Sequence, residues 1–418
     1  MSFVPVATVV LELGQPLELR SPTRTSLDGY RSARALVRLH GRPLGFVDLD
    51  LDDGPIAAQV WAALRREIDE HLRRDGLPRV ETLGDDGLPG ACRQRTAQFD
   101  AELPFATVVV ATHERPESLR VCLDAVAALD YAAFEVIVVD NAPATDATAR
   151  LVRSRDGVRY VREPHAGLAA AHNRGLAAAR GELVAFTDDD VVVDRDWLRE
   201  LAAAFRADDQ VACVTGLIAP AELETQEQLW QEECWGFDKG FERCVFDLRS
   251  DPRRSGLHPY AAGSFGSGAN MAFRTAVLRE LGGFDPALGV GAPALGGDDL
   301  AAFFEVLAAG YQLVYEPAAI VYHRHRRDYP ALRAQAFGYG VGLAAYLTKL
   351  LVERPRRLGD FARLAPRGLA HVVDAQSPKN AGKRPDYPRE LTRLERRGML
   401  YGPVAYVRGR RERRELYR

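Results

Sequence analysis

Short apolar runs of strand length alternate with stretches of helical spacing between residues 104 and 190. In chain order, the expected strands are Thr107–Ala111, Phe134–Val139, Val158–Arg162 and Glu182–Phe186. The expected helices between them are Pro116–Leu129, Asp146–Ser154 and Gly167–Arg180. Strands that alternate with helices in this way form a parallel sheet with helices on both faces. The pattern therefore predicts an α/β fold with a Rossmann-like, mostly parallel sheet.

Residues 1–100 follow a different pattern and predict a separate small α+β domain. Three apolar runs have the length of strands: Val6–Leu13, Ala35–Leu39 and Leu44–Leu49. The last two flank His40-Gly41-Arg42-Pro43, which favours a hairpin. Pro55–Arg74 has apolar residues at helical spacing, with Pro at its start and Gly76 just past its end. Residues 77–103 are rich in Gly, Pro and Asp and predict a linker.

The last part of the chain, residues 331–418, is expected to be a helical, basic extension that follows an α/β domain at 104–330. Pro330–Leu351 reads as a helix, and Arg greatly outnumbers Asp and Glu between Arg324 and Arg418. The apolar stretch 336–351 beside a basic tail is typical of a helix that lies on an anionic membrane surface. A buried core helix with a solvated basic surface explains the same pattern.

Composition sets limits on the function classes. The 418 residues are 47% hydrophobic and 27% charged, with a net charge of −3, so no nucleic-acid partner is indicated. The five cysteines lack CxxC spacing, which favours reduced thiols in the cytosol. Met1–Leu13 lacks signal-peptide features, and no apolar run reaches the length of a membrane span. We therefore expect a cytoplasmic protein, peripheral to the inner face of the membrane if residues 336–351 lie on lipid.

The run Asp188-Asp189-Asp190 is the strongest chemical signal in the chain. Adjacent carboxylates repel one another, so a cation is expected to share the run. The run follows the expected strand Glu182–Phe186, and the carboxyl ends of parallel strands are where α/β sheets bind ligands. A hard divalent ion that carries phosphate oxygens suits such a cluster. A helix N-terminus, where Asp is favoured, is the alternative.

Other polar clusters also follow expected strands. They are Thr112-His113-Glu114-Arg115, Asp140-Asn141, Gly296-Gly297-Asp298-Asp299, and the pair His323 and His325. Each alone fits a cap or a turn. Along one parallel sheet, however, strand ends of this kind converge on one crevice, which predicts a single site.

Residues 105–330 resemble a family 2 glycosyltransferase with the GT-A fold. The matching motifs, in order, are Val108–Pro116, Val138–Asn141, Gly167–Gly175, Asp188–Asp190, Gly268–Arg274, Gly282–Asp285 and Gly297–Asp299. The resemblance implies a GT-A sheet, a nucleotide-diphosphate sugar as donor, a hydroxyl acceptor, Mg²⁺ or Mn²⁺, and transfer with inversion. The acceptor could be a glycan, a lipid-linked sugar, a peptide or a metabolite.

The resemblance also implies roles for residues that bind the donor. Thr112 and Glu114 would line the pocket of the base, and Asp140 would bind the base or the ribose. The family pattern further places Arg115, Asn173 and Asp189 among the donor-binding residues. His172 stands where the family often has Arg, so no phosphate contact is assigned to it.

Metal and catalytic roles follow from the same resemblance. Asp188 and Asp190 are the two acids of the DxD signature and would hold the metal, with His323 nearby and His325 as the alternative histidine. Asp299 matches the catalytic base that deprotonates the acceptor. Because this chain has Asp298-Asp299 where Glu-Asp is commoner, Asp298 stays open as the base.

Two other functions fit parts of the sequence. Asp188–Val192 matches the nucleophile motif of haloacid-dehalogenase-like phosphatases, with Lys239 as the lysine and Asp298 and Asp299 as late metal ligands. That motif normally ends the first strand of its domain, whereas three expected strands precede it here. A non-catalytic sugar- or nucleotide-binding module is the other alternative. No G-x-G-x-x-G follows a first strand, which argues against a dinucleotide-dependent oxidoreductase.

Overall fold

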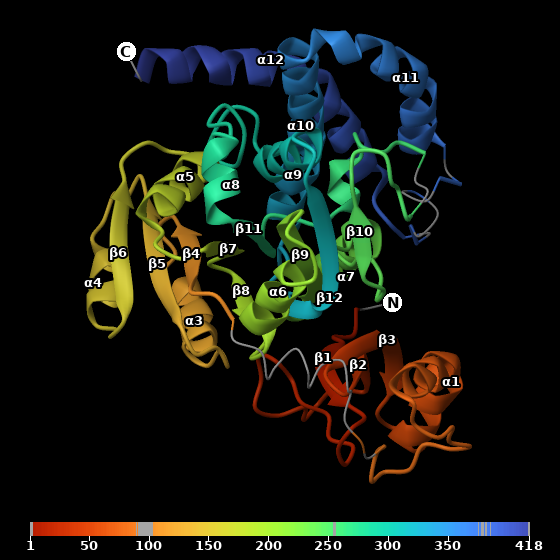
Figure 1. Ribbon diagram of the computed structural model, residues 1–418. Helices are drawn as coiled ribbons and strands as arrows, with labels where there is room; N and C mark the ends of the chain where they lie inside the picture. The colour runs from red at the N-terminus through yellow and green to blue at the C-terminus, as the bar shows by residue number, and fades with distance from the viewer. Residues whose placement is uncertain are drawn as a thin grey trace.

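The computed structural model of the chain describes residues 3–88, 90, 103–253, 256–374, 376–377, 380, 383–384 and 386–416. Residues 89 and 91–102 of the predicted linker at 77–103, including Cys92, lie outside the described residues. The N-terminal domain lies at one end of the molecule and the C-terminal helices at the other, with the large sheet between them (Figure 1).

The N-terminal domain contains a small sheet and one helix, as the sequence pattern predicts. Strands β1 (Ala7–Glu12), β2 (Ser32–Leu39) and β3 (Arg42–Asp50) pair in the order β1-β2-β3. The β2–β3 pair is antiparallel, which confirms the expected hairpin. Helix α1 (Ile56–Asp75) buries Val60, Leu64 and Ile68, which recur at helical spacing, in the core of this domain.

The central sheet is nine-stranded, in the order β10-β12-β9-β11-β7-β4-β5-β6, with β8 paired to β12. Its strands are β4 (Ala106–Thr112), β5 (Phe134–Asn141), β6 (Val158–Glu163), β7 (Leu183–Asp188), β8 (Val191–Val193), β9 (Val211–Pro220), β10 (Cys244–Phe246), β11 (Met271–Arg274) and β12 (Gln312–His323). Strands β4 to β7 are mutually parallel, and β9 is parallel to β12. The mostly parallel sheet that the sequence predicts is therefore confirmed.

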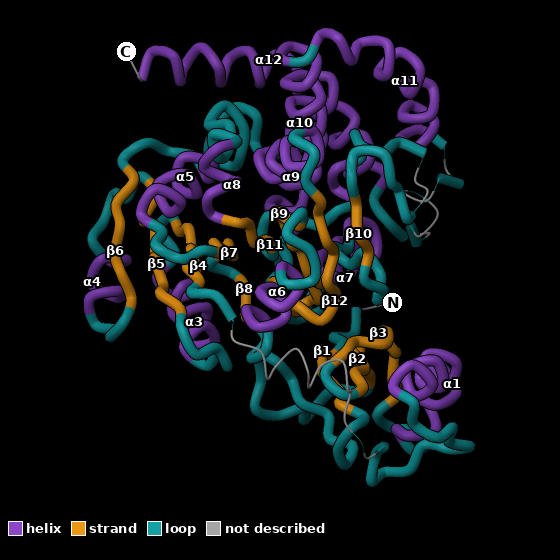
Figure 2. Tube along the Cα trace, in the orientation of Figure 1, coloured by secondary structure: helices purple, strands orange, loops and turns teal. Residues whose placement is uncertain are grey.

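Helices cover both faces of the central sheet (Figure 2). They are α3 (Pro116–Ala127), α4 (Ala147–Arg153), α5 (Leu168–Ala178), α6 (Trp197–Phe205), α7 (Gln226–Trp235), α8 (Thr275–Glu280) and α9 (Asp298–Ala308), with short 3₁₀ turns at Ala262–Ser264 and Pro355–Arg357. Successive side chains of a strand point to opposite faces. On β4, Val109 accordingly packs in one apolar layer with Leu176 of α5, and Val108 packs in the other with Leu119 of α3.

Strand β11 departs from the parallel pattern. It runs antiparallel to both of its neighbours, with Phe273 opposite Val184 of β7 and Cys213 of β9. Its four residues are too few to show a period, so the sequence pattern did not identify this strand. Strands β8 and β10, which are also short, run antiparallel to β12.

Asn270, just before β11, fixes this central region from inside the protein. Its side chain is fully buried. Its amide nitrogen donates to the carbonyl oxygens of Leu217 at 2.9 Å and Ala319 at 2.8 Å, and its oxygen accepts from Trp197 Nε1 at 2.8 Å. One side chain thereby joins β9, β12 and α6.

We expect Asn270→Ala to lower the free energy of unfolding by about 3 kcal/mol. The substitution leaves an indole N–H and two carbonyl groups buried without their partner, and each such group costs about 1–3 kcal/mol. Urea denaturation measures the effect. Asn173→Ala is a related variant whose lost partners are both on one backbone residue, Phe284, so a smaller loss is expected there. An unchanged urea midpoint for Asn270→Ala would contradict the inference.

The C-terminal extension is helical: α10 (Tyr329–Glu353), α11 (Leu358–Val373) and α12 (Arg389–Leu416). The region expected to be apolar, 336–351, lies in α10 and buries Ala336, Val341 and Tyr346 in the interior. At Gly340, a Cβ atom would lie 1.9 Å from the carbonyl oxygen of Glu395 on α12, so the two helices pack backbone to backbone. This stretch is therefore a core helix, the second of the two alternatives.

No helix in the described part of the chain has both the length and the apolar character that a membrane span requires.

Candidate active site

The three aspartates lie at the carboxyl end of β7, next to the ends of β4 and β12. Asp189 is buried and accepts hydrogen bonds from Thr112 Oγ1 at 2.6 Å and from Arg115 at 3.2 Å. Its backbone carbonyl accepts from Ser118 Oγ on α3 at 2.9 Å. Thr112 and Arg115 were predicted to bind the donor directly. The structure shows them in contact with Asp189, where they fix the conformation of the acidic run.

Asp190 lies beside two arginines and a histidine. Arg115 lies 3.1 Å away, His323 Nε2 3.4 Å and Arg326 3.5 Å. Burial acts to raise the pKa of Asp190, but the interaction with His323 and the charges of Arg326 and Arg115 outweigh it and hold that pKa below its usual range. Asp190 is therefore a carboxylate at neutral pH.

The ligand atoms of Asp188, Asp190 and His323 all lie within 4.8 Å of one another. Burial, followed by the charges of Asp190 and Asp189, raises the pKa of Asp188 well above its usual range. Burial lowers the pKa of His323 to about 4, so its imidazole is neutral and can bind a metal. Two carboxylates that repel each other beside a neutral imidazole form a donor set that fits Mg²⁺ or Mn²⁺.

Strand pairing explains why His323 and not His325 meets the acids. The antiparallel pairing of β8 with β12 sets His323 opposite Val191, the residue after Asp190. His325 instead lies 2.8 Å from Glu232 of α7 and is buried there. The sequence left this choice open because the two histidines are only two residues apart.

Asp298 and Asp299 form the first turn of α9. Asp299 Oδ2 accepts a hydrogen bond from the backbone N–H of Gly268 at 2.9 Å, and Oδ1 accepts from Leu300 N–H at 2.8 Å. Burial and the neighbouring charge of Asp298 raise the pKa of Asp299 to about 6. Asp298 is almost fully buried, 3.6 Å from His172 Nδ1. The backbone at 268–269 lies beside both acidic groups: Gly268 N–H donates to Asp299, and the Ala269 carbonyl accepts from Thr187, the residue before Asp188, at 3.0 Å.

The remaining residues predicted to bind the sugar donor are Glu114, Asp140 and Asn173, and each has different contacts. Glu114 accepts hydrogen bonds from the Ala144 and Thr145 backbone at 2.9 and 3.0 Å, so its carboxylate shapes the loop after β5. Asp140 is buried at the end of β5 and accepts from Tyr160 at 2.8 Å. Asn173 uses both polar groups of its amide on the backbone of Phe284. Asn173 is therefore a packing residue, and the structure gives it no contact with the acids.

Arg326 is a site residue that the sequence pattern did not single out. It contributes a positive charge 3.5 Å from Asp190, and the tight turn after β12 brings it there. Its signal in the sequence was weak, because Arg is abundant throughout the region after Arg324.

The strand order does not match the phosphatase alternative. Strand β7, which carries the acidic run, follows β4, β5 and β6 in the chain and is not the first strand of its domain. Lys239, which that alternative requires at the acids, interacts with the charges of Asp238 and Glu232.

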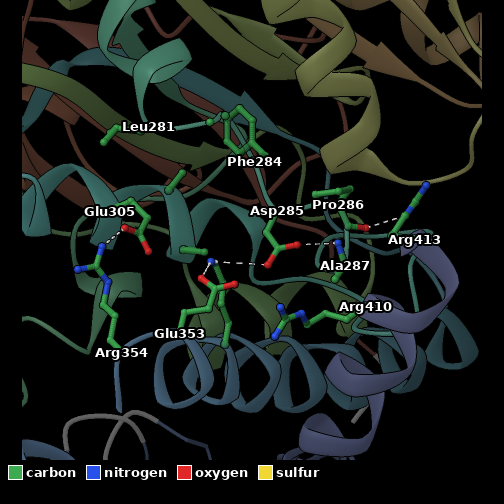
Figure 3. A pocket seen from close by; sticks show the side chains of 15 residues that line it. Leu281, Phe284, Asp285, Pro286, Ala287, Glu305, Glu353, Arg354, Arg410 and Arg413 are labelled. Carbon is green, nitrogen blue, oxygen red and sulfur yellow. Dashed lines mark hydrogen bonds and ion pairs between the residues drawn. The ribbon is translucent and has the colours of Figure 1, made fainter. Parts of the chain in front are cut away.

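A cavity of about 650 Å³ lies elsewhere, between the glycine-rich loop before α9 and helices α10 and α12. Figure 3 shows its charged lining, in which Arg413 donates to the Pro286 carbonyl at 2.9 Å. Lys349, which also lines the cavity, lies 3.7 Å from Asp285. None of the predicted catalytic or metal-binding acids lines it. The predicted acids therefore lie outside this cavity.

Comparisons with known proteins agree with the sequence motifs. Residues 107–282 match the model of glycosyl transferase family 2. A pre-mycofactocin glycosyltransferase of Mycobacterium tuberculosis is 30% identical over 244 residues, which are 57% of this chain and 47% of that protein. A glucosyl-dolichyl phosphate glucuronosyltransferase of Haloferax volcanii is 26% identical over 188 residues, 43% of this chain and 55% of that protein. The chain thus spans about half the length of these relatives.

Among solved structures, the mannosyltransferase PcManGT from Pyrobaculum calidifontis, in complex with GDP-Man and Mn²⁺, is similar, with 20% identity and a TM-score of 0.48. The match covers 75% of this chain and 92% of that one. The family match spans β4 to α8, which includes the acidic run, and β12 completes the same sheet. Residues 107–282 are therefore similar to glycosyl transferase family 2 over the strands that carry the acidic run.

Proposed function

We propose that this protein transfers a sugar from a nucleotide-diphosphate sugar to an acceptor hydroxyl, with inversion at the anomeric carbon and with help from a divalent metal. One observation carries the proposal: a metal-type donor set of Asp188, Asp190 and His323 lies on one side of the backbone at 268–269, and on the other lies Asp299, a carboxyl group whose pKa is raised to about 6. A metal-binding group near a base of raised pKa is what this reaction needs.

Asp188, Asp190 and His323 would hold the Mg²⁺ or Mn²⁺. When bound, such an ion neutralises charge that develops on the leaving diphosphate. Arg115 and Arg326 add fixed positive charge on the same side of the crevice. Because Thr112 and Arg115 hold Asp189, that carboxylate is fixed before the donor arrives, which reduces the cost of ordering the site.

The transfer itself is a single displacement. Asp299 accepts the proton of the acceptor hydroxyl as the hydroxyl oxygen bonds to the anomeric carbon. The bond from that carbon to the diphosphate oxygen breaks at the same time, and its electron pair leaves with the nucleoside diphosphate. Attack from the face opposite the leaving group inverts the configuration. Backbone hydrogen bonds from Gly268 and Leu300 orient the Asp299 carboxylate for this step.

A donor screen tests the proposal. Nucleoside diphosphate release is measured for a panel of nucleotide sugars with Mn²⁺, with Mg²⁺ and with chelator. One donor should be hydrolysed slowly in the absence of an acceptor. Proton NMR at early times should show that the released sugar has the inverted anomeric configuration. Retention of configuration would overturn the single displacement. Binding of donors without any turnover, in the presence of acceptors of each class, would favour the non-catalytic binding module.

The pKa of Asp299 predicts an acidic limit to activity. A base must be ionised, so kcat/KM should fall about tenfold per pH unit below pH 6 and level off above it. The neighbouring charge of Asp298 contributes to the raised pKa, so Asp298→Asn should move the limit to lower pH. The pH profile of kcat/KM for both proteins is the measurement. A profile that stays flat through this range would remove Asp299 as the base.

We also propose a peripheral membrane contact through α11 and α12, in place of the α10 segment. Helix α11 has no buried residue, and it exposes Leu358, Leu369 and Val373. On α12, Leu400 is 83% exposed. Arginines lie on both helices, and apolar side chains among basic ones are typical of helices that bind anionic lipid.

The protein should therefore sediment with anionic vesicles at low salt and be partly released at high salt, because screening weakens the electrostatic share. The double variant Leu369→Ser/Leu400→Ser should sediment less. Val4→Ser removes an apolar side chain of similar exposure from the N-terminal domain and serves as the control. Equal sedimentation of both variants and the wild type would refute this surface.

A further inference from the structure

A second group of metal-type ligands lies in the N-terminal domain. His40 follows β2 in the hairpin turn, and His71 and Asp75 lie one helical turn apart near the end of α1. All three side chains are buried, with exposed fractions of 4%, 6% and 5%. The three side chains therefore bring nitrogen and oxygen atoms from the hairpin and from α1 together in the interior of this domain.

Three atoms of this group converge on one point. His40 Nδ1 lies 3.2 Å from His71 Nε2 and 3.5 Å from Asp75 Oδ2, and His71 Nε2 lies 3.1 Å from the same Asp75 oxygen. Zinc bonds to nitrogen and oxygen of about 2.0–2.1 Å place the corners of a tetrahedron about 3.3–3.4 Å apart. The triangle observed here has that size.

The ring arrangement agrees with the same geometry. The two imidazole centres are 5.2 Å apart, and the ring planes are inclined by 51°. Two imidazoles bound to one tetrahedral ion through bonds of about 2.0–2.1 Å have centres roughly 5 Å apart. A hydrogen bond, by contrast, places one proton between two of these atoms, whereas an ion at the centre contacts all three.

The donor atoms also suit zinc chemically. Two imidazole nitrogens and a carboxylate oxygen make a ligand set that fits zinc among the common biological metals.

The backbone at His40 adds an independent observation. His40 has φ of 53° and Gly41 has φ of 79°, so both residues of this two-residue turn are in the left-handed region. Turns of this type strongly favour Asn-Gly. A histidine held in such a conformation, with its ring directed to the end of α1, is a local departure of the kind that accompanies functional sites.

We propose that His40, His71 and Asp75 bind one zinc ion that links the β2–β3 hairpin to the C-terminal end of α1. The fourth position is left to water or to the second oxygen of Asp75. The site is structural, because its ligands are buried and lie on elements that the ion would hold together. The inference goes beyond the proposed glycosyl transfer and does not depend on it.

The test uses the full chain in an Asp190→Ala background, which removes a ligand from the other metal-type group. After treatment with chelator and desalting, the protein is titrated with Zn²⁺ in competition with a chromogenic chelator. About one equivalent should bind tightly. Co²⁺ in place of Zn²⁺ should give the visible absorption of a tetrahedral site, and Zn²⁺ should raise the temperature of unfolding.

Ligand variants make the result specific. His40→Asn and Asp75→Asn should each weaken zinc binding about 100-fold or more. Asn fits the left-handed turn, so His40→Asn keeps the hairpin. Asp69→Asn, on the same helix and paired with Arg79 at 3.0 Å, should bind zinc like the parent protein. Absence of tight zinc binding in the folded parent, or undiminished binding in His40→Asn, would reduce the group to a hydrogen-bonded triad and overturn the proposal.

Discussion

Asp299→Asn should lower kcat by about 10²–10⁴-fold while the affinity for the donor changes little. The loss is that of a positioned general base, and the magnitude is typical for such groups. Donor affinity should persist because the diphosphate is held by the other acidic group, which contains Asp188, Asp190 and His323. Single-turnover rates with a chosen acceptor and calorimetric titration with nucleoside diphosphate measure the two quantities separately.

Asp298→Asn is the matched control for this prediction. Both residues lie in the first turn of α9, but Asp298 is buried beside His172, whereas Asp299 is only partly buried. Asp298→Asn should therefore cost less in kcat. If the two effects are reversed, Asp298 is the base. If neither variant slows turnover in protein that still binds donor, the proposed mechanism fails. Thermal unfolding of both variants checks that the turn at Gly268 is intact.

The second large effect is expected at Asp190. Asp190→Ala should weaken binding of nucleoside diphosphate in the presence of Mn²⁺ by about 100-fold or more, since a direct metal ligand is lost. Arg115, Arg326 and His323 all lie close to Asp190, so removal of its carboxylate takes away an interaction partner that the three side chains share. Calorimetric titration of the folded variant with Mn²⁺ and nucleoside diphosphate measures the loss.

Asp124→Ala provides a matched control for Asp190→Ala. Asp124 is an aspartate on α3 with a side chain that is 55% exposed and pairs with Arg155 at 2.7 Å. The Asp124→Ala variant should bind nucleoside diphosphate as the wild type does. Chelator should reproduce the Asp190→Ala defect in wild-type protein, and added Mn²⁺ should reverse it. Equal donor affinity and full turnover in chelator would exclude a metal role for Asp188 and Asp190.

The elements of the fold that could be predicted were those whose apolar residues recur with a regular period along the sequence. Alternating strands and helices from β4 to β7 follow directly from apolar runs that fill both sides of a buried sheet. Strand β11 could not be predicted because four residues are too few to show a period. Its antiparallel direction could not be predicted either, since strand direction is not encoded in the local sequence. Residues 336–351 look alike in sequence whether they face lipid or another helix, and only the contact at Gly340 decides the matter.

The site shows the same division. Acids at strand ends could be named from the sequence, because the carboxyl end of a parallel strand has a defined place in the sheet. The hydrogen-bond and ion-pair partners of these acids could not be predicted, since they depend on the conformation of loops. His323 ends β12 and lies beside Asp190, whereas His325 lies past the end of the strand and contacts Glu232. Asn173 fits the family motif, but its side-chain amide forms two hydrogen bonds with the backbone of Phe284.

Strand β11 also bears on the order in which the chain acquires its structure. In the described residues, β11 is the connection between the half of the sheet that ends in β7 and the half that begins with β9. Its residues 271–274 leave the ribosome long after β7 is complete, and β12 follows only at 312–323. Until then, the edges of β7 and β9 expose unpaired backbone groups, which are sites for aggregation. A nascent chain that stalls before residue 271 should therefore depend on chaperones far more than one that stalls after 323.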